Sequence, residues 1–270
     1  MGKTSIEWTD QSANPIRARH KATGNVGWHC VMPSPGCAHC YSHTLNGRFG
    51  TGLPYNKRSE DEIDLFLDLK SMEKLHRQRR PAKVFLCDMT DLFGEFVPFE
   101  WIDRIFELIA VSGQHTFQIL TKRPTRMAEY FRGGRPMLGN VWLGVSVEDQ
   151  QRADERIPAL LQIPAAVRFL SVEPLLAPVS LTDATRWENK AHWWGKNIRD
   201  YLHWVIIGGE SGHGARPCDL AWIRSIRDQC QAAGVPVFIK QDSGPRPGMQ
   251  GRIPDDLWAV KEFPNAAMAT

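Results

Sequence analysis

Three cysteines lie close together near the start of the chain, at Cys30, Cys37 and Cys40. Thiolates are preferred ligands of soft metal ions and iron–sulfur clusters, and clustered thiols in a reducing compartment indicate metal binding rather than disulfides. Two prolines and a glycine between the first two cysteines favour a tight loop over a helix. Three thiolates are one fewer than a fully ligated [4Fe-4S] cluster usually takes, so this spacing indicates a cluster with one open iron.

Other ligands could close such a site. A histidine at position 29, 39 or 43 would turn the three cysteines into a tetrahedral Cys3His zinc centre, which is usually structural. Cys87 is either a fourth ligand or a small buried hydrophobe. We expect Cys218 and Cys230 to be structural. The sequence leaves the cluster and the zinc site as alternatives.

The elements that position these residues are short apolar runs that alternate with amphipathic stretches, which is the pattern of an α/β fold with a parallel sheet. The 270 residues predict one α/β domain over 1–270, with its strands in a closed or partly closed barrel. We expect strands at 26–30, 83–87, 116–120, 141–146, 167–172, 203–208 and 235–239. Helices are expected at 61–76, 99–112, 124–131, 149–162 and 219–233, the last with Asp219 as its N-cap. Segment 182–202 shows neither the alternation of a strand nor the period of an amphipathic helix. We expect it to be an irregular excursion, a candidate lid.

Polar side chains follow each predicted strand. Because the carboxyl ends of parallel strands meet on one rim, we expect these side chains to lie there, together with the cysteine loop that follows the strand at 26–30. Glu173 and Glu210 are expected to face the cavity and are candidate catalytic residues with Lys240. Arg216, Lys240 and Gln241 are candidates for binding an anion, although exposed basic residues are common. The full set is Asp88, Thr90, Asp91, Thr121, Lys122, Arg123, Ser146, Glu148, Asp149, Ser171, Glu173, Glu210, Ser211, Lys240, Gln241 and Asp242.

Composition bounds the function. A net charge of +3 is too small to indicate nucleic-acid binding by itself, although ten tryptophans offer faces on which bases could stack. No apolar run is long enough to cross a membrane, and the N-terminus lacks a signal core. We therefore expect a cytoplasmic protein with no membrane partner.

Several motifs resemble one family. The stretch from Asn14 to Tyr41 is similar to the cluster loop of radical-SAM enzymes, with a tyrosine after the last cysteine as in spore photoproduct lyases. Nearly the whole chain resembles a radical-SAM-like family of unknown function common in phages and prophages, the three-cysteine-motif phage proteins. The motifs are IEWTD at 6–10, SPGC at 34–37, DMTDLF at 88–93, QILTKRP at 118–124, GVSVE at 144–148, FLSVEPL at 169–175 and GGESG at 208–212.

The resemblance implies a partial (β/α) barrel of the radical-SAM type with its site at the carboxyl ends of the strands. It implies that the three cysteines hold a [4Fe-4S] cluster whose open iron binds S-adenosylmethionine (SAM), and that one electron cleaves SAM to a 5′-deoxyadenosyl radical. Tyr41 would contact the adenine, Lys122 and Ser146 the SAM carboxylate, and Asp91 the ribose. The chain has six residues, not the usual three, between its first two cysteines.

Two classes of function follow. The first is a radical-SAM enzyme that acts on a nucleic-acid base, a nucleotide or a small anionic substrate, with an electron donor such as flavodoxin or ferredoxin as partner. The second is a non-enzymatic binding module, stabilised by zinc or a cluster, that recognises nucleic acid or a protein.

Overall fold

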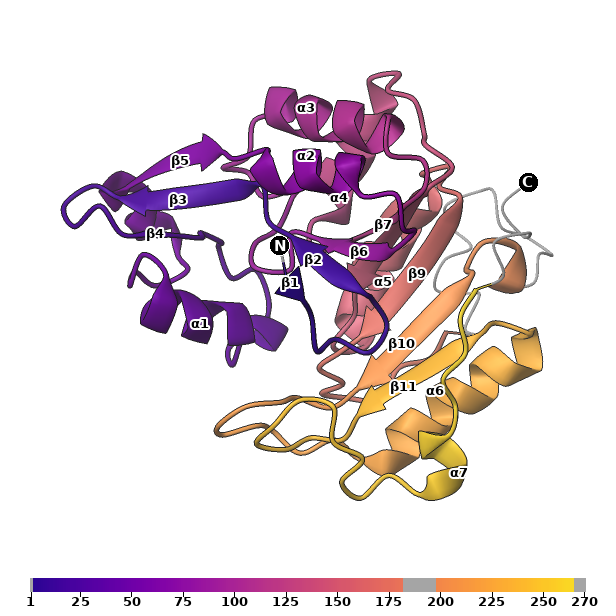
Figure 1. Cartoon of the computed structure of the whole chain (residues 1–270). Coiled ribbons are helices and arrows are strands. Elements are labelled where there is room, and N and C mark those ends of the chain that lie inside the picture. The colour runs from indigo at the N-terminus through magenta and orange to yellow at the C-terminus, as the bar shows by residue number, and fades with distance from the viewer. Residues whose placement is uncertain (1, 182–197, 265–270) are drawn as a thin grey trace. The chain divides into compact units, whose positions relative to one another are not determined.

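The computed structural model describes residues 2–181 and 198–264, which divide into two compact units (Figure 1). The first unit is Met1–Lys122 and the second is Arg123–Thr270. Most of the predicted excursion at 182–202 lies outside the described residues. Its last part is a short 3-10 helix, η5 (Ile198–Asp200), followed by the buried side chains of Tyr201 and Leu202. None of the described helices is both long and apolar enough to cross a membrane.

The first unit contains a sheet with the strand order β1-β2-β6-β7. Its strands are β1 (Gly2–Lys3), β2 (Gln11–Ala13), β6 (Lys83–Leu86) and β7 (Thr116–Thr121). The last three run parallel, while β1 is antiparallel to β2. Helix α3 (Phe99–Ala110) connects β6 to β7 and packs beside α2 (Lys70–Arg77). The apolar faces of the strands and of α3 are buried together, which gives this unit its core.

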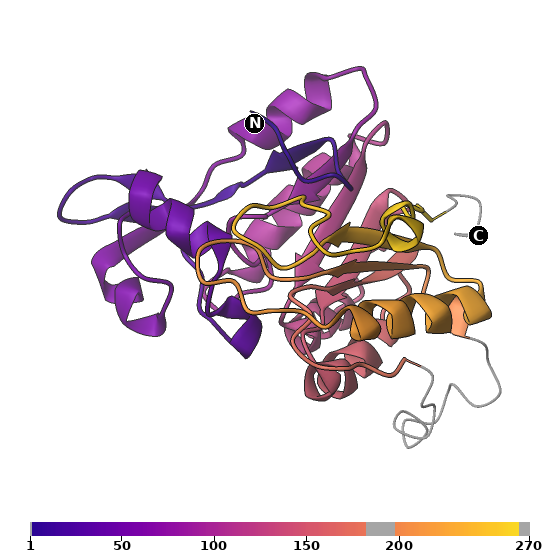
Figure 2. The ribbon, with the colours of Figure 1, turned by 90° about the horizontal axis from the view of Figure 1, so that it is seen from below.

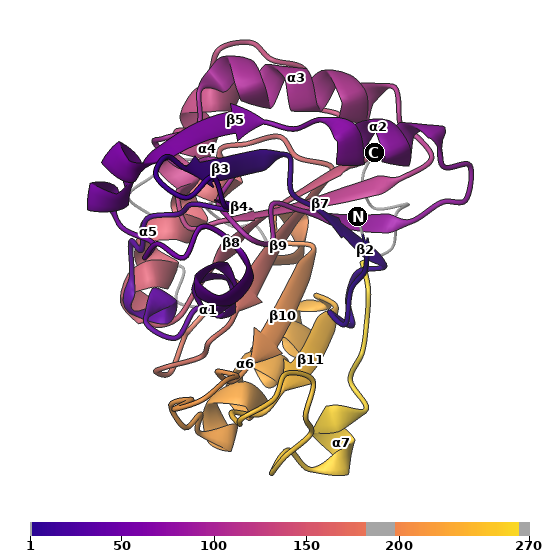
Figure 3. The same cartoon turned by 60° about the vertical axis from the view of Figure 1, so that its left-hand side comes forward.

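A smaller antiparallel sheet, β4-β3-β5, separates β2 from β6 in sequence (Figure 3). It consists of β3 (Ile16–His20), β4 (Val26–Gly27) and β5 (Ile63–Leu67), and the same region contains η1 (Pro35–Cys37), α1 (Tyr41–Phe49) and η2 (Lys57–Glu62). Two sequence predictions were wrong here. The strand expected at 26–30 belongs to this sheet, and the first parallel strand is β2, whose three residues show no apolar run. The helix expected at 61–76 is limited to α2, because the apolar residues of β5 alternate with period two and pair with β3.

The second unit has four parallel strands in the order β8-β9-β10-β11. The strands are β8 (Val141–Ser146), β9 (Val167–Val172), β10 (Trp204–Gly208) and β11 (Val237–Gln241). Its helices are α4 (Pro124–Arg132), α5 (Gln150–Leu161), α6 (Leu220–Ala233) and α7 (Asp255–Trp258). Helix α6 packs against β10 and β11 (Figure 2). As predicted, the Asp219 side chain caps α6 by accepting a hydrogen bond from the Ala221 N–H.

Helices α3, α5 and α6 each connect two neighbouring parallel strands of one unit. Two parallel strands in the first unit, β6 and β7, and all four in the second follow positions predicted from the apolar runs, whereas β2 was not predicted. The prediction of an α/β fold of the partial (β/α) barrel type is confirmed.

A buried ion pair joins α5 to the carboxyl end of β8. Arg156 donates to Glu148 Oε2 at 2.9 Å and to the carbonyl oxygen of Ser146 at 2.8 Å. Glu148 is 0% exposed and Arg156 5% exposed. Water therefore cannot solvate either charge, and each depends on the other.

We predict that Arg156→Met lowers the free energy of unfolding by about 3–5 kcal/mol, because it leaves the Glu148 carboxylate buried without its cation. The double variant Glu148→Gln/Arg156→Met should recover part of this loss. Urea denaturation followed by circular dichroism measures both. The control is Arg224→Met, which removes an exposed ion pair with Asp256 in the same unit. If Arg156→Met destabilises the protein no more than Arg224→Met, the pair does not fix this strand end.

Candidate functional site

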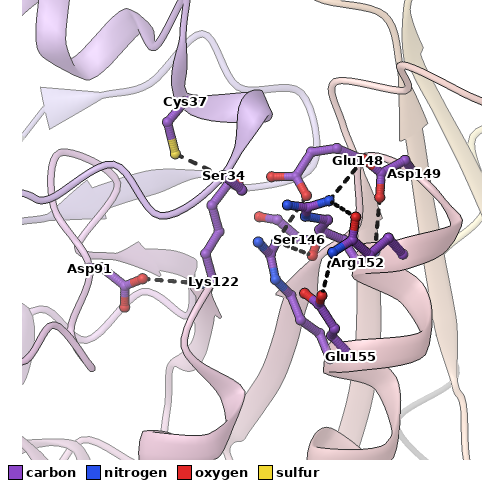
Figure 4. Close-up of polar contacts among 11 residues, drawn as sticks. Ser34, Cys37, Asp91, Lys122, Ser146, Glu148, Asp149, Arg152 and Glu155 are labelled. Carbon is purple, nitrogen blue, oxygen red and sulfur yellow. Dashed lines mark hydrogen bonds and ion pairs between the residues drawn. The ribbon is translucent and has the colours of Figure 1, made fainter.

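The three clustered cysteines lie on a loop of tight turns between β4 and α1. The N–H of Cys37 donates to the carbonyl oxygen of Ser34 at 3.0 Å, and that of Cys40 to the carbonyl oxygen of Cys37 at 3.2 Å. The Ser34 hydroxyl lies 3.9 Å from Cys37 Sγ (Figure 4). Cys37 is buried, Cys30 and Cys40 are half-buried, and all three are free thiols. The tight loop predicted from the prolines and glycine is therefore present.

This loop is attached to the segment that follows β6. The Tyr41 hydroxyl donates to the carbonyl oxygen of Asp88 at 2.7 Å, and the Ser42 hydroxyl donates to that of Met89 at 2.6 Å. The Thr90 hydroxyl donates to the carbonyl oxygen of His29, just before the first cysteine. The expectation that the loop follows a parallel strand was wrong, because it follows β4 of the antiparallel sheet. These hydrogen bonds nevertheless hold it beside the carboxyl end of β6.

Tyr55 contacts the same carbonyl group as Ser42. Its buried hydroxyl donates to the carbonyl oxygen of Met89 at 2.9 Å and lies 3.0 Å from the Ser42 hydroxyl. Burial raises the pKa of Tyr55 far above its usual value, a hydrogen bond with Ser42 opposes this shift in part, and Cys30 and Cys40 raise the pKa further. Both of these thiols thus lie within electrostatic range of one phenol.

The three histidines that could complete a zinc site differ in their surroundings. His29 Nε2 is 3.6 Å from a carboxylate oxygen of Glu60, and its ring packs edge-on against Phe96. His39 is exposed, and the His43 ring lies 5.4 Å from that of Tyr55. Within 2–181 and 198–264, no group of three or more His, Cys, Asp or Glu side chains is arranged to hold a metal ion.

The donor set of the loop fits an iron–sulfur cluster. A cubane binds each thiolate to a different iron, so its ligands surround a bulky group and do not converge on one atom. The turn-rich loop supplies three thiols, none of them in a disulfide and two of them half-buried. The three cysteines are therefore the residues that would hold such a cluster.

Cys87 lies just after β6 in a different environment. Burial raises the pKa of its thiol well above the usual value, and the nearby Asp88 and Asp91 raise it further. Its backbone adopts φ +61°, a left-handed conformation that is uncommon outside glycine. The Cys87 side chain is 2% exposed, which fits a small buried hydrophobe.

The Asp91 carboxylate is 6% exposed and bonds to its own unit. Its Oδ1 accepts from the Thr121 hydroxyl at 2.7 Å and from the Phe93 N–H at 3.0 Å, and its Oδ2 accepts from the Lys122 N–H at 3.1 Å (Figure 4). The carboxylate thus fixes the end of β7 and the backbone of the half-buried Lys122, which is the next residue. A contact with ribose remains a prediction for this residue.

The remaining predicted SAM ligands are Tyr41 and Ser146. Tyr41 is 46% exposed, so part of its ring faces solvent although its hydroxyl is bonded to Asp88. Ser146 is buried at the end of β8 in the second unit, whereas Lys122 is the last residue of the first. The predicted pairing of Lys122 with Ser146 stays a prediction.

Three acidic residues at strand ends of the second unit have cationic partners. Lys240 Nζ lies 2.6 Å from Glu173 Oε1, which also accepts from Gln241 at 3.1 Å. Arg216 forms a charged pair with Glu210, donating from Nε to Oε2 at 2.9 Å. Candidate anion-binding and catalytic residues are thus brought together as ion pairs.

The third pair ties two loops to β11. Arg252 donates to both carboxylate oxygens of Asp242, from Nε at 2.9 Å and from Nη2 at 2.8 Å, and also to the carbonyl oxygen of Cys218. A Cβ on Gly209 would lie 2.3 Å from the Ser243 nitrogen. This glycine therefore permits the close approach of two backbone segments.

Sequence reasoning missed several supporting residues. Arg156 had a signal, since it shares the buried face of α5 with Ala153, Ile157 and Leu160. Such an arginine on an apolar face indicates a buried acidic partner. Ser42 and Tyr55 had none, because their role depends on the position of the Met89 carbonyl, which only the fold determines.

No curated protein and no solved structure shows significant similarity to the chain. One family model matches residues 3–252, which is nearly the whole chain, and its description is a protein of unknown function. The chain therefore belongs to the DUF5131 family of proteins of unknown function.

Proposed function

We propose that this protein is a radical-SAM-type enzyme that holds one [4Fe-4S] cluster through Cys30, Cys37 and Cys40. The observation that carries the proposal is the attachment of a three-thiol loop to the carboxyl end of a parallel strand by side-chain hydrogen bonds to residues 88 and 89. A partial (β/α) barrel is compatible with such enzymes, and its active sites lie at the carboxyl ends of the strands.

In this proposal, different residues hold the cluster, support its loop and contact SAM. A bound cluster with an open iron supplies the electron that cleaves SAM to a 5′-deoxyadenosyl radical. The three thiolates hold the cluster, while Ser42 and Tyr55 keep the loop in place. The exposed part of the Tyr41 ring offers a surface for adenine, and its hydroxyl is already fixed by Asp88.

The SAM carboxylate would be bound by Lys122 and Ser146, since an ammonium and a hydroxyl satisfy a carboxylate with charge-assisted hydrogen bonds. Beyond SAM, the Lys240–Glu173 pair is a candidate for moving a proton, because its two groups share a hydrogen bond at 2.6 Å. Glu210 is the weaker catalytic candidate, because Arg216 binds both of its carboxylate oxygens.

The substrate class in this proposal is a nucleic-acid base, a nucleotide or another small anionic molecule. The electron would come from a donor such as flavodoxin or ferredoxin.

We predict that anaerobic reconstitution with iron and sulfide gives a brown protein with about four irons per chain and an absorption band at about 400 nm. Cys37→Ala should lose most of this iron, because two thiolates hold a cubane poorly. Iron and sulfide analysis measures the change. The matched control is Cys218→Ala, which removes a buried thiol whose pKa burial raises to about 12 and should leave the iron content unchanged. A colourless protein with one tightly bound zinc would support the binding module instead.

Lys122→Ala should weaken SAM binding by about 1.5–3 kcal/mol if its ammonium bonds the carboxylate directly. It should also slow the release of 5′-deoxyadenosine in the presence of dithionite. Equilibrium binding to the reconstituted protein measures the affinity, and Lys57→Ala, an exposed lysine of the same unit, is the control. Equal affinity of the two variants for SAM would remove Lys122 from the site.

A further inference from the structure

The first unit contains a cavity of about 340 Å³ that is distinct from the cysteine residues themselves. Its lining includes Arg17 of β3, Trp28, and Lys70 and Lys74 of α2. Small-molecule sites in proteins commonly span about 300–1,000 Å³, so this volume is enough for a small ligand.

The cavity carries an excess of positive charge. Three cations line it, Arg17, Lys70 and Lys74, against one carboxylate, that of Asp68. One Asp68 oxygen is already occupied, since it accepts from the Lys70 N–H at 3.1 Å. Lys70 and Lys74 are one helical turn apart on α2, and neither forms an ion pair with any other residue that the structure describes. Two ammonium groups on the same face thus lack an anion.

Arg17 and Trp28, both in the lining, contact each other. The Arg17 guanidinium lies 4.8 Å from the Trp28 ring centroid, and its Nε donates to the carbonyl oxygen of Gly27 at 3.0 Å. Burial lowers the pKa of Arg17, and Asp68 offsets this shift only in part. An anion beside the guanidinium would compensate the buried charge. The Trp28 Nε1 atom is buried and has no hydrogen-bond acceptor among the described residues.

The position of the cavity links it to the cysteine loop. Asn14, just beyond β2, lines the cavity. Its amide donates to Asp88 Oδ1 at 2.6 Å and accepts from the Met89 N–H at 3.0 Å. Asp88 and Met89 are also the residues that Tyr41 and Ser42 contact. The cavity and the loop are therefore held by the same two residues.

We propose that this cavity binds a phosphate group, carried either by a free nucleotide or by a nucleic-acid strand. Lys70, Lys74 and Arg17 supply the positive charge, and the Ser71 hydroxyl of the lining supplies a further donor to the phosphate oxygens. The proposal goes beyond the radical-SAM function and does not require the cluster. If both hold, the phosphate belongs to the substrate, which would then be a nucleotide or a nucleic acid.

The test uses two probes with the purified chain: AMP, followed by calorimetry, and a fluorescein-labelled single-stranded DNA of ten nucleotides, followed by anisotropy. The pocket variant is Lys70→Gln/Lys74→Gln. The matched control is Lys57→Gln/Arg58→Gln, which removes two exposed cations of the same unit outside the cavity. Circular dichroism checks that both variants are folded.

We expect the pocket variant to bind AMP at least tenfold more weakly, while the control variant binds like the wild type. For the DNA probe, the negative slope of log K against log salt concentration should become shallower by about 1.4, because each lost phosphate contact removes about 0.7 from its magnitude. Binding of AMP by the wild type that the pocket variant loses supports a free nucleotide phosphate, and binding of the DNA without binding of AMP supports a nucleic-acid strand. The proposal is overturned if the wild type binds neither probe, or if the pocket and control variants bind equally well.

Discussion

The attachment of the cysteine loop to residues 88–90 is the contact on which the proposed chemistry depends. The loop leaves an antiparallel sheet, so no parallel strand carries it to the rim. Hydroxyl groups of Tyr41, Ser42 and Tyr55 instead bond backbone carbonyls just beyond β6. Because the bonds of Ser42 and Tyr55 to the Met89 carbonyl are buried, breaking either of them leaves an unsatisfied polar group. The fold thus holds three thiols at the end of the sheet where parallel α/β folds place their chemistry.

The second unit secures its strand ends by a different means. Arg156 pairs with Glu148, Arg216 with Glu210, Lys240 with Glu173 and Arg252 with Asp242. Each acid follows a strand; Arg156 and Lys240 come from another helix or strand, whereas Arg216 and Arg252 lie on the same loop as their partner. Ion pairs of this kind contribute less to stability than to specificity of arrangement, because the desolvation of both charges offsets much of their attraction. They leave most of these polar residues already partnered, which restricts how many could meet a substrate.

The sequence predicted the sheet well where strands are apolar on both faces. Strands β8 to β11 read as continuous apolar runs because helices cover them, and they were placed within a few residues. β2 escaped prediction because its three residues include Gln11 and Ser12, and β5 was taken for helix because Ile63, Leu65 and Leu67 fit either period over so short a span. The cysteines were visible from spacing alone. Their hydrogen-bonded supports and the basic cavity were not, since both arise from residues that are distant in sequence, such as Arg17 and Lys70.

The central claim is that three cysteines hold a cluster whose fourth iron is open. Low-temperature electron paramagnetic resonance of the anaerobically reconstituted, dithionite-reduced protein, recorded with and without SAM, tests it most directly. An open iron predicts the signal of a reduced [4Fe-4S] cluster with g values that change when SAM is added. A signal that SAM leaves unchanged, or no cluster signal in protein that is otherwise folded, would contradict the account.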